Sequence, residues 1–361
     1  MEETAVQPYT HFRCTECGGP LVSKGNTYVC HSCSAMWPTV DGIPIFVDLS
    51  KTPYWGEIPA REMTRLLTYA RRYGWRKAAK DFFEQANPYL FRYIVNESRS
   101  DWRYLLPLRT DSLVLDAGCG WGAVTLALSE VCQVVAIDYR PERMQFVSIR
   151  MEQEQIDAIS LACANVRQMP FDDNYFDAVI LNGVLEWVGE GSAEHDPQTE
   201  QQIVLQEIHR VLKAGGALYI GIENRIGYPY FFGKRDEHSN LRFATLLPRA
   251  LANAYSKVVR KTPYRTYTHG YRGYQNLLTQ TGFATSEFHI PLPNYRSPSY
   301  ILPFHHRGIT DYYLDNLLIL ASTRRVVFYT ISKFLLTLGI WRYFPHSYSI
   351  LAYKGVKPEG V

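Results

Sequence analysis

The sequence predicts an α/β protein built on a parallel sheet, and three observations lead to that prediction. Short apolar runs recur through the middle of the chain, a helix-like stretch follows most of them, and a glycine-rich turn joins the first run to its helix. The runs cover residues 113–115, 133–137, 159–162, 176–181 and 217–222. Apolar runs without polar alternation are typical of strands buried on both faces. Their alternation with helices implies a parallel sheet with right-handed crossovers.

The glycine-rich turn lies in Ser112–Gly122, SLVLDAGCGWG. It follows the first strand directly, and Ala123–Leu128 then reads as the start of a helix. Glycines at this point let the backbone approach a ligand that a side chain would exclude. Their spacing is G-x-G-x-G, whereas dinucleotide-binding turns have G-x-G-x-x-G.

Two acids at strand ends indicate which ligand the turn binds. Asp116 lies two residues before the first glycine, where it would repel a pyrophosphate but suit an ammonium or sulfonium group. Asp138 ends the second strand, where a carboxylate can accept hydrogen bonds from ribose hydroxyls. An adenosine with a cationic tail fits this pair better than NAD does. That ligand is S-adenosylmethionine.

The segment resembles the class I S-adenosylmethionine-dependent methyltransferases, and the match continues at residues 165–171, 176–187 and 212–222. The resemblance implies a Rossmann-like sheet of seven strands, with Ser347–Tyr353 as a final antiparallel strand. Where many relatives carry an aspartate that binds adenine, this chain has Asn165, whose amide oxygen could accept the same bond. The cofactor-binding residues implied are Asp116, Gly118, Gly120, Gly122, Asp138, Tyr139, Asn165, Val166 and Asn182.

A second motif comprises two C-x-x-C pairs, Cys14/Cys17 and Cys30/Cys33. Four thiolates from two such turns supply the closed tetrahedral set of a structural zinc site. A pair of disulfides is the competing interpretation, and a cytosolic setting argues against it. Residues 37–46, WPTVDGIPIF, resemble the zinc-ribbon partner subunit of tRNA methyltransferases, and similar ribbons begin some rRNA guanine methyltransferases.

Composition shifts divide the chain into four parts. We expect a zinc ribbon over 1–50, a helical linker or cap over 51–108, the methyltransferase core over 109–290 and a C-terminal extension over 291–361 that completes the sheet. Further predicted elements are helices at 62–73, 75–86, 89–106, 141–155, 198–213 and 271–282, and a strand at 283–290. The helix at 198–213 is expected to stop at Gly215-Gly216.

An apolar stripe near the C-terminus predicts one more helix. Its members are Val327, Ile331, Phe334, Leu335, Leu338 and Trp341. The stripe predicts either a helix packed on the core or one lying on a membrane. We favour packing, because an apolar helical stripe ordinarily faces a core. Charged residues interrupt every apolar run here, so no bilayer-spanning helix is predicted.

Candidate catalytic residues follow the fifth strand, in the polar and aromatic stretch 222–248 and beyond it. A hydroxyl acceptor needs a base near its proton, and histidine titrates in the useful range. His238 and Glu223 are the first candidates and His269 is the third, with a structural role left open for each. Glu186 and Trp187, after the fourth strand, are expected to point toward the reaction pocket.

The proposed activity from sequence is methyl transfer to a hydroxyl or carboxyl of a saccharide or glycan precursor. The words IENR and DEHS resemble methyltransferases of polysaccharide and lipopolysaccharide assembly. An RNA methyltransferase is the alternative, which the ribbon permits. The net charge of +3 and the lack of a basic stripe give it no support. A cofactor-binding protein without turnover is a third interpretation.

Polar opening residues without a basic-then-apolar segment predict a cytoplasmic protein. If the C-terminal helix lies on a membrane, the membrane contact would be peripheral. The sequence leaves the oligomeric state open.

Overall fold

The structure is a computed structural model that describes residues 11–49, 56–190, 195–317 and 323–357. The chain forms two compact units. The first comprises residues 1–181, 206–218 and 356–361, and the second comprises 182–205 and 219–355.

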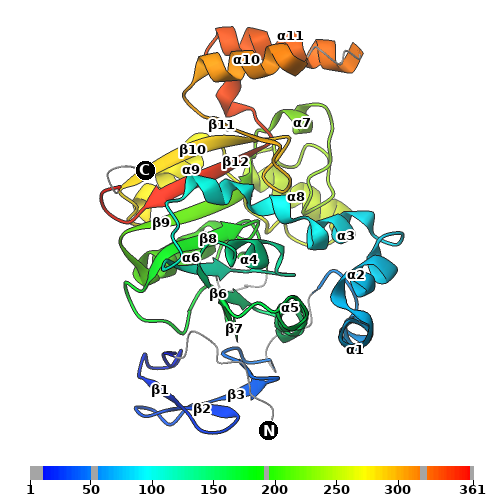
Figure 1. The fold of residues 1–361 in the computed structure, drawn as a ribbon. Helices are drawn as coiled ribbons and strands as arrows, with labels where there is room; N and C mark the ends of the chain where they lie inside the picture. Colours follow the sequence, from blue (N-terminus) through cyan, green and yellow to red (C-terminus); the bar gives the residue numbers. More distant parts are fainter. Residues whose placement is uncertain (1–10, 50–55, 191–194, 318–322, 358–361) are drawn as a thin grey trace. The chain divides into compact units, whose positions relative to one another are not determined.

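The sheet of the first unit has the predicted parallel strands, in the order β8-β5-β6-β7. Leu115 in the central strand β5 lies opposite Val135 on one side and Val179 on the other. Helix α4 connects β5 to β6, and α5 connects β6 to β7 (Figure 1). Their bounds are β5 Leu113–Ala117, α4 Ala123–Leu128, β6 Gln133–Asp138, α5 Pro141–Glu154, β7 Ile159–Cys163 and β8 Phe176–Asn182.

A helical block precedes this sheet, as predicted for the cap. It comprises α1 Ala60–Tyr73, α2 Trp75–Phe83, α3 Pro88–Val95 and the 3₁₀ segment η1 Glu97–Leu105. Leu66, Ala70 and Phe83 pack in one apolar cluster with Trp121 of the glycine turn and Phe146 of α5. The block therefore packs directly behind the predicted cofactor turn.

The single helix predicted over 89–106 is wrong, because α3 and η1 are separate. Asn96 between them has extended backbone angles, φ −86° and ψ 104°. Its side-chain oxygen accepts a hydrogen bond from the Ser98 amide at 3.2 Å. An asparagine that binds the backbone ahead of it starts a new turn rather than continuing a helix.

The N-terminal region folds as a small antiparallel sheet in the order β1-β2-β3-β4. Its strands are β1 Leu21–Ser23, β2 Thr27–Cys30, β3 Met36–Val40 and β4 Ile43–Pro44. This sheet docks on the edge strand β7: Ile45 pairs with Cys163, and the Phe46 amide donates to the Cys163 carbonyl at 2.7 Å. The Phe12 ring lies 6.1 Å from that of Phe171.

Helix α6 spans Pro197–Val211, and β9 begins at once with Leu212 and runs to Glu223. The prediction that the helix continues to residue 213 and stops at Gly215-Gly216 is therefore wrong. Lys213 forms an ion pair with Asp177 of β8 at 2.7 Å. A Cβ on Gly216 would come within 3.2 Å of the Asp177 carbonyl oxygen. The two glycines let β9 approach β8 closely instead of ending a helix.

The second unit contains the rest of β9 and three further strands, in the order β11-β10-β12-β9. Strand β12, Ser347–Tyr353, confirms the predicted final strand and pairs antiparallel with β10, Thr285–Leu292. Strand β11, Tyr300–Pro303, joins the seven expected strands and pairs antiparallel with β10. The helices here are α7 Tyr228–Phe231, α8 Arg249–Arg260, α9 Tyr271–Gln280, α10 Arg307–Leu317, α11 Thr323–Thr337 and the 3₁₀ turn η3 Trp341–Tyr343.

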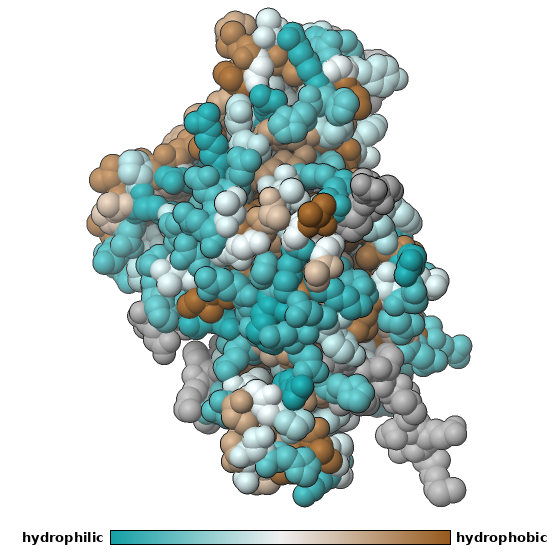
Figure 2. Space-filling model, turned by 90° about the vertical axis from the view of Figure 1, so that its left-hand side faces the viewer, coloured by the Kyte–Doolittle hydropathy of each residue, from teal (hydrophilic) through white to brown (hydrophobic). Residues whose placement is uncertain are grey.

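The C-terminal helix α11 does not bury most of the predicted apolar stripe. Leu335 is half-buried and Trp341 is buried, but the other members are exposed, namely Val327, Ile331, Phe334 and Leu338. Hydrophobic side chains, in brown, reach the surface at the top of Figure 2, the end at which α10 and α11 lie. The packed face is offset from the predicted one and includes Ser332 and Leu336. Ion pairs accompany this orientation.

Those ion pairs hold α11 against α10. Lys333 of α11 forms ion pairs with Asp311 and Asp315 of α10. Tyr329 donates a hydrogen bond to Asp315 at 3.0 Å. The preference for packing of the stripe is thus wrong for its four exposed members, and a membrane role remains a prediction. Among the described residues, no helix is both long and apolar enough to cross a bilayer.

Candidate functional site

The first candidate site is built around Asp116, at the carboxyl end of β5 in the first unit. Its side chain is buried, and its Oδ2 accepts a hydrogen bond from the Thr125 hydroxyl at 2.6 Å. Burial raises the pKa of Asp116 to about 7, the charge of Asp138 adds to the effect, and Thr125 and Arg99 oppose it. A buried carboxylate that its own protein leaves so poorly compensated is suited to a cationic ligand.

The glycine turn gives a ligand room beside this acid. Gly120 has a φ of +57°, and the nearest neighbour of a Cβ placed there would be the Tyr93 hydroxyl at 3.8 Å. The space at Gly120 is therefore open. Gly122 differs, because its Cβ would lie 2.8 Å from Val147 of α5. Helix packing therefore excludes a side chain at Gly122, whereas Gly120 stays the predicted position of ligand approach.

Asp138, at the end of β6, binds the backbone of the turns around it. Its Oδ2 accepts from the Gly120 amide at 3.0 Å, and its Oδ1 accepts from the Arg140 amide at 2.9 Å. Arg143 lies 3.4 Å from Oδ2. An ionised carboxylate has about four acceptor positions, so Asp138 has capacity left for a ribose hydroxyl.

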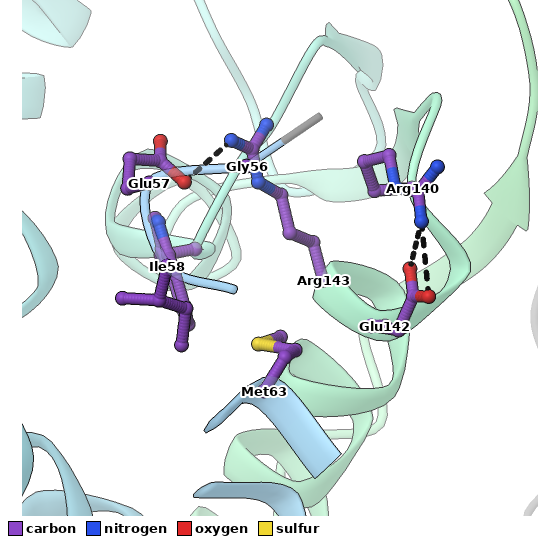
Figure 3. Close-up of a pocket in the computed structure, with 8 residues that line it drawn as sticks. Gly56, Glu57, Ile58, Met63, Arg140, Glu142 and Arg143 are labelled. Atoms are coloured by element: carbon purple, nitrogen blue, oxygen red, sulfur yellow. Dashed lines mark hydrogen bonds and ion pairs between the residues drawn. The ribbon is translucent and has the colours of Figure 1, made fainter. Parts of the chain in front are cut away.

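A small pocket opens beside Asp138 in the same unit (Figure 3). Arg143 reaches across it to Glu57, with the Nη2 and Oε2 atoms 2.7 Å apart, and Arg140 pairs with Glu142 at 3.0 Å. Met63 and Ile58 form its apolar side (Figure 3). Both arginines were missed in the sequence. Their signal was their position two and five residues after the strand-end acid.

The other predicted cofactor residues are placed as follows. Tyr139 is exposed directly after β6, and Asn165 and Val166 are half-buried directly after β7. The Asn165 side-chain oxygen accepts from the Arg167 amide at 3.0 Å, so part of its acceptor capacity is used locally. Gly118 donates its amide to the Ile137 carbonyl at 2.8 Å. Asn182 belongs to the second unit, and neither polar atom of its buried side chain has a hydrogen-bond partner among the described residues.

The four ribbon cysteines converge as predicted. Their sulfur atoms all lie within 4.8 Å of one another, with Cys14–Cys33 at 3.7 Å and Cys17–Cys30 at 3.5 Å. None of the four is in a disulfide. Tetrahedral zinc with bonds of about 2.3 Å separates its sulfurs by about 3.8 Å, so the cluster fits such an ion. The Gly19 amide donates to the Cys17 sulfur at 3.4 Å, and the Ser32 amide donates to the Cys30 sulfur at 3.3 Å.

The second candidate site lies in the second unit and brings together Glu186, Glu223 and His238. One donor atom from each lies within 4.8 Å of the others, and all three side chains are at most 1% exposed. The Tyr295 hydroxyl is 3.4 Å from Glu186 and 3.2 Å from Glu223. The sequence candidates Glu223 and His238 are therefore neighbours, and Glu186 joins them.

The word DEHS explains how His238 is held. His238 Nδ1 lies 3.3 Å from Asp236, and Asp236 also accepts from the amide and hydroxyl of Ser239. The Tyr264 hydroxyl donates to the same carboxylate at 3.1 Å. A carboxylate fixed in this way orients the imidazole so that Nε2 faces Glu186 and Glu223.

Burial and neighbouring charges shift the pKa values of the three residues in different directions. Burial and the neighbouring Glu223 raise the pKa of Glu186. For Glu223, burial is outweighed by the charges of Arg296 and His238, and its pKa is lowered. For His238, burial is outweighed by Glu223, Asp236 and Glu186, and its pKa is raised well above the usual value. The cluster thus holds its charges by mutual pairing.

Arg296 completes the cluster and was missed in the sequence. It forms ion pairs with Glu223 and with Glu237. Its neighbour Tyr295 bridges the two carboxylates. Both follow β10 in a proline-rich segment, and no local pattern there marks them as partners of acids about 60 to 110 residues earlier.

His269, the third catalytic candidate, has a separate environment. Its Nε2 lies 2.9 Å from the Gln201 side-chain oxygen, and its ring packs against Tyr267 and Tyr274. Burial and two nearby arginines, Arg249 and Arg225, lower its pKa to about 3. These contacts describe a neutral imidazole held within the fold.

Comparison with known proteins identifies the domain that carries the first site. Residues 115–220 match the family described as "Methyltransferase domain". This part of the chain is similar to that family, and the match covers less than a third of the 361 residues. The predicted Rossmann-like class I methyltransferase fold, with a mixed sheet and flanking helices, is therefore confirmed.

Relatives match about a third of the chain. The 24-methylenesterol C-methyltransferase 2 of Arabidopsis thaliana is 31% identical over 140 residues, which are 37% of this chain and 35% of that protein. The demethylmenaquinone methyltransferase of Bacillus cereus is 28% identical over 122 residues, 33% of this chain and 47% of that protein. The chain thus spans between a third and a half of the length of these relatives.

Among solved structures, phosphoethanolamine N-methyltransferase 2 of Haemonchus contortus is similar with a TM-score of 0.45 and 16% identity. The alignment covers 84% of this chain and 62% of that one.

Proposed function

We propose that the chain is an S-adenosylmethionine-dependent methyltransferase that acts on an oxygen of a polar acceptor, a saccharide or glycan precursor. The observation that carries the proposal is the buried set Glu186, Glu223 and His238, which lies in the unit that follows the methyltransferase strands. Carboxylates, an imidazole and a guanidinium are groups that bind hydroxyls. The relatives named for a sterol and for demethylmenaquinone give this acceptor class no support, and the polar cluster is the reason to prefer it.

The first site supports the choice of cofactor. Asp116 would hold the cationic end of S-adenosylmethionine, and Asp138 would accept from its ribose. Gly120 leaves the space that the ligand needs. S-adenosylmethionine, when bound, supplies a methyl group on a sulfonium centre. The chain's own part is to orient that cofactor, hold the acceptor oxygen and exclude water.

The test of the acceptor class is formation of S-adenosylhomocysteine with a panel of sugar nucleotides and glycan fragments, with total tRNA as a second panel. We expect turnover with a member of the first panel. Turnover with tRNA alone, with binding that weakens steeply in salt, would favour the RNA alternative. No product from either panel, with S-adenosylmethionine still bound, would favour a binding protein.

His238→Asn and Glu223→Gln are expected to lower turnover by about 100-fold or more, because each removes a group that holds the acceptor oxygen or its proton. S-adenosylmethionine affinity should stay as in the unaltered protein, since neither residue lies in the first site. Glu190→Gln, an exposed acid of the same unit, is the matched control. Equal turnover in all three variants would show that the cluster takes no part in catalysis.

Cofactor affinity should depend on pH through Asp116. Its pKa of about 7 means that a proton must leave before the carboxylate can pair with a cation. The dissociation constant for S-adenosylmethionine should therefore rise about tenfold between about pH 8 and pH 6. Isothermal titration at the two pH values measures this, with Asp157→Asn as an exposed-acid control. Equal affinity at both values would contradict the role of Asp116.

We further infer that the four-cysteine ribbon holds a structural Zn²⁺. The sulfur separations suit tetrahedral coordination, and four protein ligands leave no open position for chemistry. Its role would be to keep the small β1–β4 sheet folded, because this region buries few apolar side chains of its own.

A further inference from the structure

We infer that Glu186, Glu223 and His238 form a second metal site, for a divalent transition-metal cation bound by two carboxylates and one imidazole. The inference stands on the geometry of the second unit. Only the idea that the ion binds an oxygen of the acceptor rests on the proposed function. Such a site is separate in chemistry from the ribbon, which offers sulfur alone.

The donor atoms lie close together without hydrogen-bonding one another. His238 Nε2 lies 3.7 Å from Glu186 and 3.7 Å from Glu223. A charge-assisted hydrogen bond would bring these atoms to about 2.8 Å, so the imidazole donates to neither carboxylate. Two ligands at about 2.1 Å from one ion in tetrahedral geometry are about 3.4 Å apart, close to the observed separation.

Each of the three residues has one buried polar atom without a hydrogen-bond partner among the described residues. These atoms are Glu186 Oε2, Glu223 Oε2 and His238 Nε2, and each is shielded from solvent. The other carboxylate oxygens are occupied, since Tyr295 binds both acids and Arg296 binds Glu223. Buried polar atoms are ordinarily hydrogen-bonded or bound to a metal, so three donor residues with such atoms at one place favour a bound ion over direct contact alone.

The surroundings provide the second shell that metal sites use. Asp236 fixes the other nitrogen of His238, in the carboxylate–histidine order that orients an imidazole toward a metal. Arg296 forms ion pairs with Glu223 and Glu237.

Mixed carboxylate and imidazole donors suit Mn²⁺ and Zn²⁺. With only three protein ligands, such an ion keeps a position open for an oxygen of the acceptor. The site would thereby select acceptors that present a hydroxyl or carboxyl oxygen.

The test is a titration of the full chain, already loaded with zinc at the ribbon, with Mn²⁺ followed by electron paramagnetic resonance. We expect one saturable Mn²⁺ per chain, competed by Zn²⁺. Glu186→Gln and His238→Asn should weaken it tenfold or more, whereas Glu190→Gln should bind as the unaltered chain does. Retained S-adenosylmethionine binding shows that the variants are folded.

Two results would overturn the inference. One is the absence of any saturable Mn²⁺ or Zn²⁺ binding beyond the ribbon ion, which would leave a trapped water between the three residues. The other is equal Mn²⁺ affinity in Glu186→Gln, His238→Asn and Glu190→Gln. Mn²⁺ binding without turnover on any glycan would reject the proposed acceptor but not the metal site. Turnover on a glycan without Mn²⁺ or Zn²⁺ binding would reject the metal site but not the proposed acceptor.

Discussion

Asp116→Asn is expected to abolish S-adenosylmethionine binding and at the same time to stabilise the ligand-free protein. Loss of the carboxylate that we propose to pair with the cationic end of the cofactor should weaken binding by about 100-fold or more, as for other buried charge pairs. Asparagine keeps an oxygen for the Thr125 hydroxyl, so the local hydrogen bond observed at 2.6 Å can survive.

The stabilisation follows from the direction of the pKa shift. Burial raises the folded-state pKa of Asp116 to about 7 from an ordinary value of 3.8. Above pH 7 the folded protein must hold an ion that the unfolded chain holds more easily, which costs up to about 4 kcal/mol. That cost shrinks as the pH falls from 7 toward 4, where the acid is protonated in the folded state.

Urea unfolding of the ligand-free variant at two pH values measures this effect. The free energy of unfolding should exceed that of the unaltered protein near pH 8 and should match it near pH 4. Asp157→Asn, at an exposed position of the same unit, should change neither binding nor stability. A variant that is less stable than the unaltered protein at pH 8 would show that Asp116 supports the fold rather than the ligand.

Local patterns were sufficient to predict the first site. Asp116 and Asp138 end buried strands, and the glycines follow at fixed spacing, so a few consecutive residues carry the whole signal. The same holds for the ribbon, where each C-x-x-C turn is a local unit. Parallel-sheet topology then determines that both acids come to the same edge.

The second site depends on contacts between distant segments, and only part of it could be predicted. Glu223 and His238 stood out as titratable groups after the fifth strand. Tyr295 and Arg296 meet them only because the chain returns after β10, and nothing in their own neighbourhood marks that return. The prediction that the α11 stripe packs on the core was wrong for a similar reason. Lys333 of α11 pairs with acids of α10, and hydrophobic periodicity does not report such ion pairs.

Removal of the ribbon zinc is expected to weaken cofactor binding, although the ribbon contains none of the predicted cofactor residues. The small sheet docks on residues 163–172, which include Asn165 and Val166. Its contacts there are the Phe46 amide to the Cys163 carbonyl at 2.7 Å and the Arg13 amide to the Pro170 carbonyl at 2.9 Å. An ion pair between Arg13 and Asp172 adds to them.

Loss of these backbone contacts frees the loop that would face adenine. Two hydrogen bonds are worth about 1 kcal/mol each, so a fall in S-adenosylmethionine affinity of roughly tenfold or more is expected on loss of the ribbon fold. Cys14→Ser combined with Cys33→Ser removes two of the four metal ligands in the full chain. Isothermal titration with S-adenosylmethionine and metal analysis by mass spectrometry measure the two outcomes.

Arg13→Ala separates metal loss from loss of docking. It keeps all four cysteines, so zinc should remain, and it removes only the side-chain ion pair to Asp172. Its effect on affinity should be smaller than that of the double cysteine variant, because partly exposed ion pairs contribute little. If the zinc-free variant binds S-adenosylmethionine as tightly as the unaltered chain, the ribbon does not support the adenine loop. Loss of affinity in the cysteine variant with retained zinc would instead point to a direct effect of the cysteines.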